Sequence, residues 1–248
     1  MAAARTIAVT GAGRGIGATI ALELARRGFT VGCLTRSGGG PALKDVPAES
    51  ARRLVNCRCD VTDEASVRRA FEELARRAGG LHGLVNNAGI HVDAASHEMT
   101  TETYERVMAV NATAVFSACR EAFPHLQSAG GGIIVNIGSF FDKLGVRRSL
   151  AYCASKAAVG AMTRCLAVEW GRKGIRVVNV APGYIETDLN REAMTKGPLR
   201  EYLARRIPGG RHGSAADVAR LVGALFSEDI PFLTGETIYL DGGQGIAH

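Results

Sequence analysis

The chain reads Arg5-Thr6-Ile7-Ala8-Val9-Thr10-Gly11-Ala12-Gly13-Arg14-Gly15-Ile16-Gly17, and this stretch decides the fold. Its first six residues are mostly apolar and β-branched, a pattern typical of a buried strand. A glycine-rich turn follows, and residues 18–27 continue with a helical pattern. A strand, a glycine turn and a helix in this order form a site for a dinucleotide pyrophosphate, because backbone amides and a helix N-terminus then face the phosphates. The glycine spacing is Gly-x-x-x-Gly-x-Gly, from Gly11, Gly15 and Gly17.

Strand-like and helical patterns alternate along the rest of the chain, with no long linker and no internal repeat. The further strand-like runs are 29–35, 54–59, 82–85, 132–137, 176–181 and 237–240, and the helical patterns are 62–78, 101–128, 149–171 and 215–226. This alternation predicts one domain over residues 1–248, with a Rossmann-type, doubly wound α/β fold of about seven parallel strands and helices on both faces. Ligands of such folds bind beyond the carboxyl ends of the strands.

Composition excludes several classes of function. The 248 residues are 46% hydrophobic and 22% charged, which suits one globular domain with a well-filled core. The net charge of +6 comes without a basic patch interleaved with aromatic residues, so we expect a solvated basic surface and no nucleic-acid partner. No apolar run approaches the ~20 residues of a membrane span, and no apolar signal segment precedes the first strand. The sequence therefore predicts a cytoplasmic protein without a membrane partner.

The residues after the second strand indicate which dinucleotide binds. In NAD sites an acidic residue about 20 positions beyond the glycines binds the ribose 2′-hydroxyl, but the chain has no acid between Glu23 and Asp45. It has Arg36 there, followed by Ser37. An arginine can hold a 2′-phosphate through charge-assisted hydrogen bonds, and Arg14 in the glycine turn can reach the same phosphate. The sequence favours NADP(H) over NAD(H).

Tyr152 and Lys156 indicate acid–base chemistry. They are four residues apart on a predicted helix, so they share one face. A phenol ordinarily titrates near ~10, and a neighbouring ammonium lowers its pKa toward the range of a catalyst at neutral pH. Asn111 lies in the middle of an apolar helical face, where asparagine competes poorly for helix, so we expect it to have a partner or a function.

Together these residues resemble the short-chain dehydrogenase/reductase family over essentially the whole chain. The matching residues are Thr10 to Gly17, Asn86-Asn87-Ala88-Gly89, Asn111, Ser139, Tyr152-Cys153-Ala154-Ser155-Lys156 and Pro182-Gly183. The separations also fit the family, with 28 residues from Asn111 to Ser139 and 13 from Ser139 to Tyr152. The resemblance implies a nicotinamide-dependent interconversion of a carbonyl and an alcohol.

The resemblance also implies roles for a catalytic tetrad. Tyr152 would protonate the carbonyl oxygen or deprotonate the alcohol, and Ser139 would hydrogen-bond the same oxygen. Lys156 would bind the nicotinamide ribose and lower the pKa of Tyr152. Asn111 would hold a water that links Lys156 to solvent. No metal is required, and no cluster of histidine, cysteine and acid has ligand spacing.

The cofactor would lie along the carboxyl ends of the strands. Asp60 and Val61 would flank the adenine, Asn87 would line the groove, and Ile185 and Thr187 would bind the carboxamide. The full set of expected cofactor-binding residues is Gly11, Arg14, Gly15, Ile16, Gly17, Arg36, Ser37, Asp60, Val61, Asn87, Ala88, Gly89, Tyr152, Lys156, Pro182, Gly183, Ile185 and Thr187.

Apolar and aromatic residues are expected to wall the substrate pocket. They are Phe140, Phe141, Leu144 and Tyr184, and they favour a small apolar or aromatic carbonyl substrate. Residues 188–207 are expected to form an irregular segment that acts as a lid. His91 and His97 follow the Asn-Asn-Ala-Gly turn, and we interpret them as loop histidines beside the pocket without a catalytic role.

Three functions stay open, and a homotetramer is expected. Many members of the family reduce 3-oxoacyl groups on an acidic carrier protein and have basic residues before the fifth strand. Residues 122–132 contain no lysine or arginine, so we rank a free ketone above a carrier-bound thioester. A non-catalytic dinucleotide sensor ranks lower, because a sensor does not need all four tetrad residues. The long apolar helices around Asn111 and Tyr152 exceed what one sheet face can cover, which favours the tetramer.

Overall fold

The computed structural model describes residues 5–42, 46–187 and 190–247. Seven parallel strands form one sheet in the order β3-β2-β1-β4-β5-β6-β9. The strands are β1 (Thr6–Thr10), β2 (Thr30–Thr35), β3 (Leu54–Arg58), β4 (Gly83–Asn86), β5 (Gly132–Ile137), β6 (Ile175–Pro182) and β9 (Thr237–Leu240). The strand order changes direction between β1 and β4, so the crevice for a ligand opens there, beyond their carboxyl ends. The predicted fold class is confirmed.

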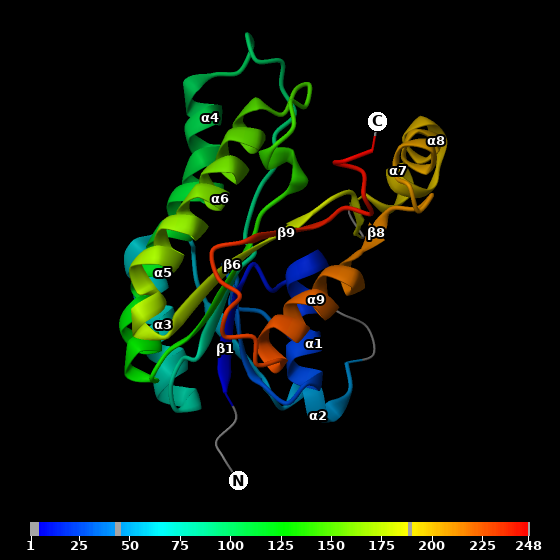
Figure 1. The fold of residues 1–248 in the computed structure, drawn as a ribbon. Coiled ribbons are helices and arrows are strands. Elements are labelled where there is room, and N and C mark those ends of the chain that lie inside the picture. Colours follow the sequence, from blue (N-terminus) through cyan, green and yellow to red (C-terminus); the bar gives the residue numbers. More distant parts are fainter. Residues whose placement is uncertain (1–4, 43–45, 188–189, 248) are drawn as a thin grey trace.

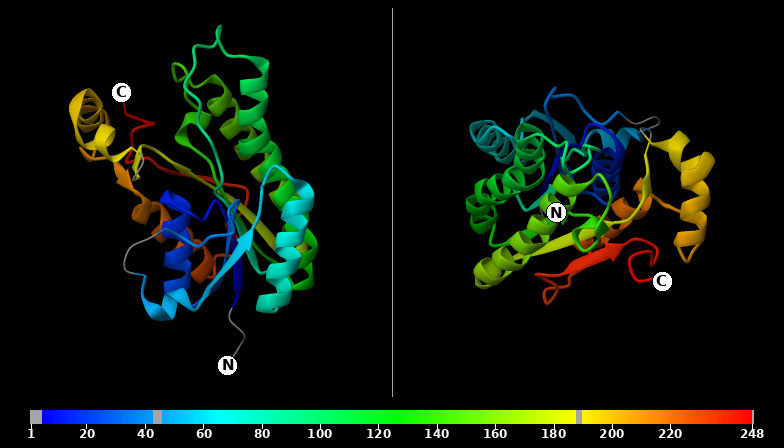
Figure 2. Two further views of the ribbon diagram at one scale, coloured as in Figure 1. Left: turned by 180° about the vertical axis from the view of Figure 1, so that it is seen from behind. Right: turned by 90° about the horizontal axis from the view of Figure 1, so that it is seen from above.

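Helices cover both faces of the sheet (Figures 1 and 2). One face is covered by α1 (Gly15–Arg26) and α9 (Ala215–Ser227). The other is covered by α3 (Glu64–Ala78), α5 (Ala114–Ser128) and α6 (Leu150–Trp170). Along β1, the side chains of Ile7 and Val9 point into the hydrophobic core between the sheet and the α1–α9 layer. That of Ala8 points into the core on the opposite face of the sheet. Because both faces of the strand are buried, its sequence is a continuous apolar run.

Side-chain caps fix the ends of several helices. The Asp63 carboxylate accepts a hydrogen bond from the Ala65 amide at 3.0 Å and begins α3, and Gly79, with a φ of 75°, ends that helix. Ser214 and Asp217 form a reciprocal capping box at the start of α9. None of the helices in the described ranges is long and apolar enough to cross a membrane.

The prediction of one regular helix over 101–128 is wrong in the middle of that range. The structure has α4 (Thr101–Met108), a π-helical turn η1 (Ala109–Thr113) and then α5. The π-helical turn holds Asn111, whose side chain bonds to a different part of the chain, as described below. A π-turn adds one residue to the helix and often occurs where a side chain has a special role.

The segment predicted to be irregular over 182–207 is also largely regular. It contains β7 (Ile185–Glu186), α7 (Arg191–Thr195) and α8 (Gly197–Arg206). Pro198 lies in the first turn of α8, where its missing amide proton removes no helical hydrogen bond. Asp188 and Leu189, which belong to the expected lid, lie outside the described residues. The sequence also did not predict the short α2 (Ala48–Ala51) or β8 (Gly213–Ser214), which pairs with β7.

Candidate active site

The carboxyl ends of the strands bring the predicted motifs to one edge of the sheet. Asn87, after β4, braces the glycine turn after β1: its Nδ2 donates to the Thr10 carbonyl at 3.0 Å and to the Gly11 carbonyl at 3.3 Å. A Cβ on Gly17 would lie 2.3 Å from both Asn87 Nδ2 and the Gly11 oxygen. Only glycine therefore fits at position 17, and the carboxamide of Asn87 faces the turn.

The glycine turn and the N-terminus of α1 form a cradle for an anion. Gly11 and Gly15 have φ values of 65° and 56°, which favour glycine. Across the described chain no side chain caps the first turn of α1, so its amides are open to a ligand. A Cβ on Gly15 would lie 3.7 Å from Thr187 Cγ2, so the loop after β6 faces the turn. The expected pyrophosphate of a dinucleotide fits these residues.

Arg14 and Arg36 lie exposed at the predicted adenosine end. Within the described ranges, neither guanidinium has a salt bridge or a side-chain hydrogen bond. The hydroxyl and amide of Thr62 hold the pKa of Asp60 below its usual value, and the charge of Arg36 lowers this pKa further. Arg36 and Asp60 therefore share one neighbourhood, and the two arginines are available to an anionic group.

Lys156 lies one turn after Tyr152 on α6, with Nζ 5.6 Å from the centroid of the phenol ring. The lysine is 5% exposed, and Nζ donates to the Ile137 carbonyl at 2.7 Å. Burial lowers the pKa of Lys156 to about 8.

The predicted pKa shift of Tyr152 is wrong in direction. Burial raises the pKa of this phenol, and a side-chain hydrogen bond with Ser139 offsets the rise only in part. The sequence placed Lys156 near the phenol correctly, but it did not reveal that Lys156 is buried and Tyr152 half-buried. Loss of water destabilises the phenolate and the ammonium alike, so the Tyr152 phenol carries its proton at neutral pH.

Asn111 joins the loop after β4 to α6. Its Oδ1 accepts from the Ile90 amide at 2.8 Å, and its Nδ2 donates to the Ile90 carbonyl at 2.8 Å and to Ser155 Oγ at 3.1 Å. The expected partners of this asparagine are therefore the Ile90 backbone and the Ser155 hydroxyl. A Cβ on Gly89 would lie 3.3 Å from Asn111 Oδ1 and 3.8 Å from Lys156 Nζ, so both groups face the same position. The predicted water relay from Lys156 stays a prediction.

Aromatic rings gather around Tyr152. The Phe141 ring lies 6.0 Å from the Tyr152 ring and 6.0 Å from the Tyr184 ring, and Phe140 lies 5.7 Å from Tyr184. Ser139 Oγ accepts from the Phe141 amide at 3.2 Å, which holds the phenylalanine turn next to this predicted catalytic serine. The structure thus brings these predicted pocket residues together, with Leu144 half-buried just beyond them.

Asn190 is a site residue that the sequence reasoning missed. Its Oδ1 accepts from the Thr187 amide at 2.7 Å, and its Nδ2 donates to the Ile185 carbonyl at 3.0 Å. It therefore fixes the loop that carries both residues expected at the carboxamide. An asparagine three residues after a threonine is a turn signal that could have identified it.

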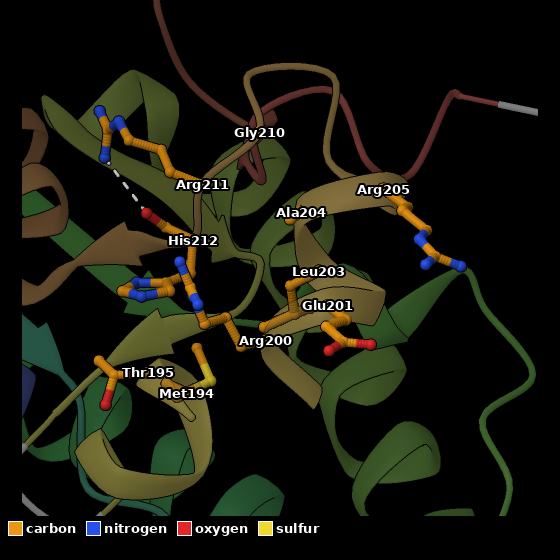
Figure 3. A pocket seen from close by; sticks show the side chains of 10 residues that line it. All are labelled: Met194, Thr195, Arg200, Glu201, Leu203, Ala204, Arg205, Gly210, Arg211 and His212. Atoms are coloured by element: carbon orange, nitrogen blue, oxygen red, sulfur yellow. Dashed lines mark hydrogen bonds between the residues drawn. The ribbon is translucent and has the colours of Figure 1, made fainter. Parts of the chain in front are cut away.

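A hollow of about 550 Å³ lies beside α7 and α8 (Figure 3). Its lining residues are Met194, Thr195, Arg200, Glu201, Leu203, Ala204, Arg205, Gly210, Arg211 and His212. As far as the structure is described, none of the four residues of the predicted tetrad lines it, but Tyr184 of the aromatic cluster packs against Met194 and Leu203 of its lining. Glu186 joins the two sides of this region, with Arg191 at 2.8 Å and His212 at 3.6 Å.

The two loop histidines, which the sequence treats alike, differ in the structure. His91 Nε2 lies 3.1 Å from Ser149 Oγ, and its ring centroid lies 5.0 Å from that of Tyr152. The His97 side chain is 84% exposed, with Glu98 at 3.9 Å. His91 is therefore a neighbour of Tyr152, the predicted acid–base residue, and sequence reasoning did not identify this contact.

Known proteins resemble this chain along almost its whole length. A family model described as enoyl-(acyl carrier protein) reductase matches residues 11–244. The chain is 37% identical over 247 residues to the 3-oxoacyl-[acyl-carrier-protein] reductase MabA of Mycobacterium tuberculosis, covering 98% of this chain and 94% of the relative. It is 35% identical over 243 residues to 3beta-hydroxysteroid dehydrogenase 1 of Eggerthella lenta, covering 97% and 93%. The solved structure of ElxO with NADP bound superposes with a TM-score of 0.89 at 28% identity, covering 97% and 98%.

Proposed function

We propose, from the premise that this chain belongs to the short-chain dehydrogenase/reductase family, that it is an NADPH-dependent reductase of a small apolar or aromatic ketone. As a member of that family it is an oxidoreductase that acts on a CH–OH or C=O group with a nicotinamide dinucleotide. The observation that carries the proposal is the neutral phenol of Tyr152, which Ser139 contacts and aromatic rings surround.

The geometry favours reduction with Tyr152 as the proton donor. The nicotinamide, when bound, supplies the hydride. Tyr152 gives its proton to the carbonyl oxygen, and Ser139 hydrogen-bonds that oxygen. The resulting phenolate is stabilised by the ammonium of Lys156, whose pKa of about 8 lets it release and regain a proton near neutral pH. Asn111 Oδ1 faces the same position as Lys156 Nζ, which supports a proton path at Gly89.

A 3-oxoacyl thioester on a carrier protein is the second candidate substrate. The 37% identity to a reductase of that class favours it. So does Lys173 of η3 (Gly171–Lys173), whose Nζ lies 5.2 Å from the centroid of the Phe123 ring. Residues 122–132 contain no lysine or arginine, but Lys173 from another part of the chain lies beside Phe123 of that stretch. Lys173 and its exposed neighbour Arg172 could contact an acidic carrier.

One set of assays decides between the two candidates. A panel of aliphatic and aromatic ketones is compared with one 3-oxoacyl group, presented as a small thioester and on an acyl carrier protein, each with NADPH and with NADH. We expect kcat/KM to be highest for a ketone with NADPH. A carrier-bound substrate that exceeds every ketone by about a hundredfold, and loses that advantage in Lys173→Glu, would establish the second candidate.

We also propose that the protein is a homotetramer. Large apolar side chains are exposed on the two helices that flank the site: Phe116 on α5 is 44% exposed, and Leu150 and Val168 on α6 are 49% and 84% exposed. Large exposed apolar side chains on these helices favour an interface between copies of the chain. Light scattering at micromolar concentration is expected to give about four times the 26.1 kDa of one chain; a stable monomer would refute the proposal.

A further inference from the structure

We propose that His91 is a positioning residue for Tyr152: its ring holds the catalytic phenol, and the Ser149 hydroxyl holds the ring. The inference rests on the proposed function, because it concerns the phenol that would move the proton. It assigns a role to one of two histidines that the sequence alone does not distinguish.

The contact between the two rings has a favoured geometry. The rings of His91 and Tyr152 meet with centroids 5.0 Å apart and planes at 86°, an edge-to-face arrangement. Phe141 meets the same phenol at 6.0 Å and 90°. Two perpendicular rings therefore restrict the rotation of the Tyr152 ring, while Lys156 lies near it on the same helix.

Tyr152 needs such support because of its place in the helix. It is the third residue of α6, in the first turn, where the amides lack helical partners. Ser149 is the N-cap residue, but among the described residues its side chain makes no capping bond. Its hydroxyl, on a residue only 3% exposed, instead meets His91 Nε2 at 3.1 Å and the Arg147 carbonyl at 3.4 Å. The hydroxyl that would ordinarily cap the helix thus serves the histidine.

The loop after β4 is joined to this helix start at further points. The Ala94 amide donates to the Arg148 carbonyl at 3.0 Å, and the Asp93 carboxylate pairs with the Arg148 guanidinium. Arg148 has a φ of 63°, the one positive value of a non-glycine residue among the described residues. A side-chain-bearing residue adopts that strained conformation only where its surroundings hold it. The backbone before Tyr152 is therefore fixed by the loop that carries His91.

The other end of this loop is fixed as well. Asn111 binds both the amide and the carbonyl of Ile90, the residue before His91. His91 is thus held on one side by the tetrad asparagine and on the other by Ser149. Its ring, on an exposed residue, contacts the phenol of the half-buried Tyr152 directly. The charged and titratable groups around this contact are Lys156 and Cys153 on α6 and the pair Asp93–Arg148 in the two loops.

Three variants separate the two contacts of His91. His91→Gln keeps a hydrogen-bonding group for Ser149 but loses the ring, His91→Phe keeps a ring but loses the hydrogen bond, and Ser149→Ala removes the anchor alone. Because small displacements of a catalytic group slow the chemical step strongly, we expect His91→Gln to lower kcat for ketone reduction about tenfold and the other two about threefold. The Kd for NADPH is expected to stay unchanged in all three. His97→Gln, in the same loop, is the matched control and should behave as wild type.

A titration that needs no turnover provides the second readout. The ionisation of Tyr152 is followed by near-ultraviolet absorbance, as the difference between each protein and the same protein with Tyr152→Phe. Burial raises the pKa of this phenol, so removing the covering ring admits water and should lower the midpoint in His91→Gln. His91→Phe should leave the midpoint in place.

The outcomes distinguish the inference from the function on which it rests. If His91→Gln, with an unchanged circular dichroism spectrum, keeps both the wild-type kcat and the wild-type titration midpoint, the inference is overturned. If the midpoint moves but wild type reduces no carbonyl compound, the positioning role stands and the proposed function fails. An equal loss in His97→Gln would also overturn the inference, because it would show a general effect of the loop.

Discussion

The two ends of the crevice over the sheet are built differently. At the adenosine end the surface consists of the glycine backbone of the turn after β1 and the open first turn of α1, which the Asn87 carboxamide braces and the exposed Arg14 and Arg36 flank. At the substrate end the surface consists of side chains that four separate segments supply: Phe141, Tyr152, Tyr184 and His91. The first end tolerates almost no added atom, whereas the second can change its shape through single substitutions.

The largest effect is expected at the substrate end. Tyr152→Phe keeps the ring contacts with Phe141 and His91 but removes the proton donor. We expect kcat to fall by about a thousandfold or more while NADPH binds with wild-type affinity. Stopped-flow turnover and fluorescence titration of NADPH measure the two quantities. Tyr104→Phe on α4 is the matched control, and a Tyr152→Phe enzyme with substantial kcat would contradict the acid–base role.

The second-largest effect is expected at the adenosine end, where it tests whether the glycine turn tolerates an added methyl group. Gly17→Ala places a methyl group 2.3 Å from Asn87 Nδ2 and the Gly11 oxygen, so the turn must shift. Overpacking of this kind costs about 1–3 kcal/mol, which we expect as a loss of NADPH affinity of up to about a hundredfold. Gly171→Ala is the matched control, since a Cβ there meets no described atom within 4 Å. Equal NADPH affinities in the two variants would contradict the inference that the glycine turn tolerates no added methyl group.

A smaller effect, also at the adenosine end, concerns the preference for NADPH over NADH. Arg36 is exposed, so solvent weakens its hydrogen bond to a 2′-phosphate, and we expect wild type to prefer NADPH over NADH by about tenfold in kcat/KM. Arg36→Asp should reverse the preference, because a carboxylate accepts from ribose hydroxyls and repels phosphate. Arg26→Asp, at the far end of α1, makes the same change in net charge as a control. If the ratio of kcat/KM for NADPH to that for NADH is unchanged in Arg36→Asp, Arg36 does not contact the 2′-phosphate.

The smallest expected effect is a decrease of kcat at alkaline pH, which originates at the substrate end. Lys156 has a pKa lowered to about 8, so its ammonium loses a proton as the pH rises past that value. The phenolate formed at Tyr152 is then less stabilised, and kcat for reduction should fall on the alkaline side of about 8. A profile that is flat from neutral pH to well above this value would show that Lys156 stays charged or does not act on the phenol.

The sequence predicted the adenosine end better than the substrate end for a physical reason. The glycine turn is one continuous stretch, so its own pattern identifies it, although Asn87 and Thr187, which face it, lie far away in the sequence. The contact of His91 with Tyr152, and that of Lys173 with Phe123, join residues that are far apart in the chain. No local pattern predicts them.

Two other errors have separate causes. The direction of the Tyr152 pKa depends on burial, which the sequence reveals only as a tendency, whereas the neighbouring Lys156 follows from helix geometry. The missed helix α8 had a start signal, because proline at a first turn is typical of helices. The expectation of an irregular segment up to residue 207 overlooked this signal.

The π-turn at Asn111 affects which side chains of α5 face the sheet. An α-helix advances about 100° per residue, so one residue more or less rotates the next turns by that angle. In α5 the buried face consists of Val115, Ala118, Cys119, Ala122 and Leu126. An extra or missing residue within α5 itself would therefore turn this face away from the sheet and bring Phe116 and Arg120 toward the core. The wider π-turn instead accommodates one additional residue without that rotation. Deleting Ala112 should therefore leave α5 facing the sheet and alter only the turn that holds Asn111.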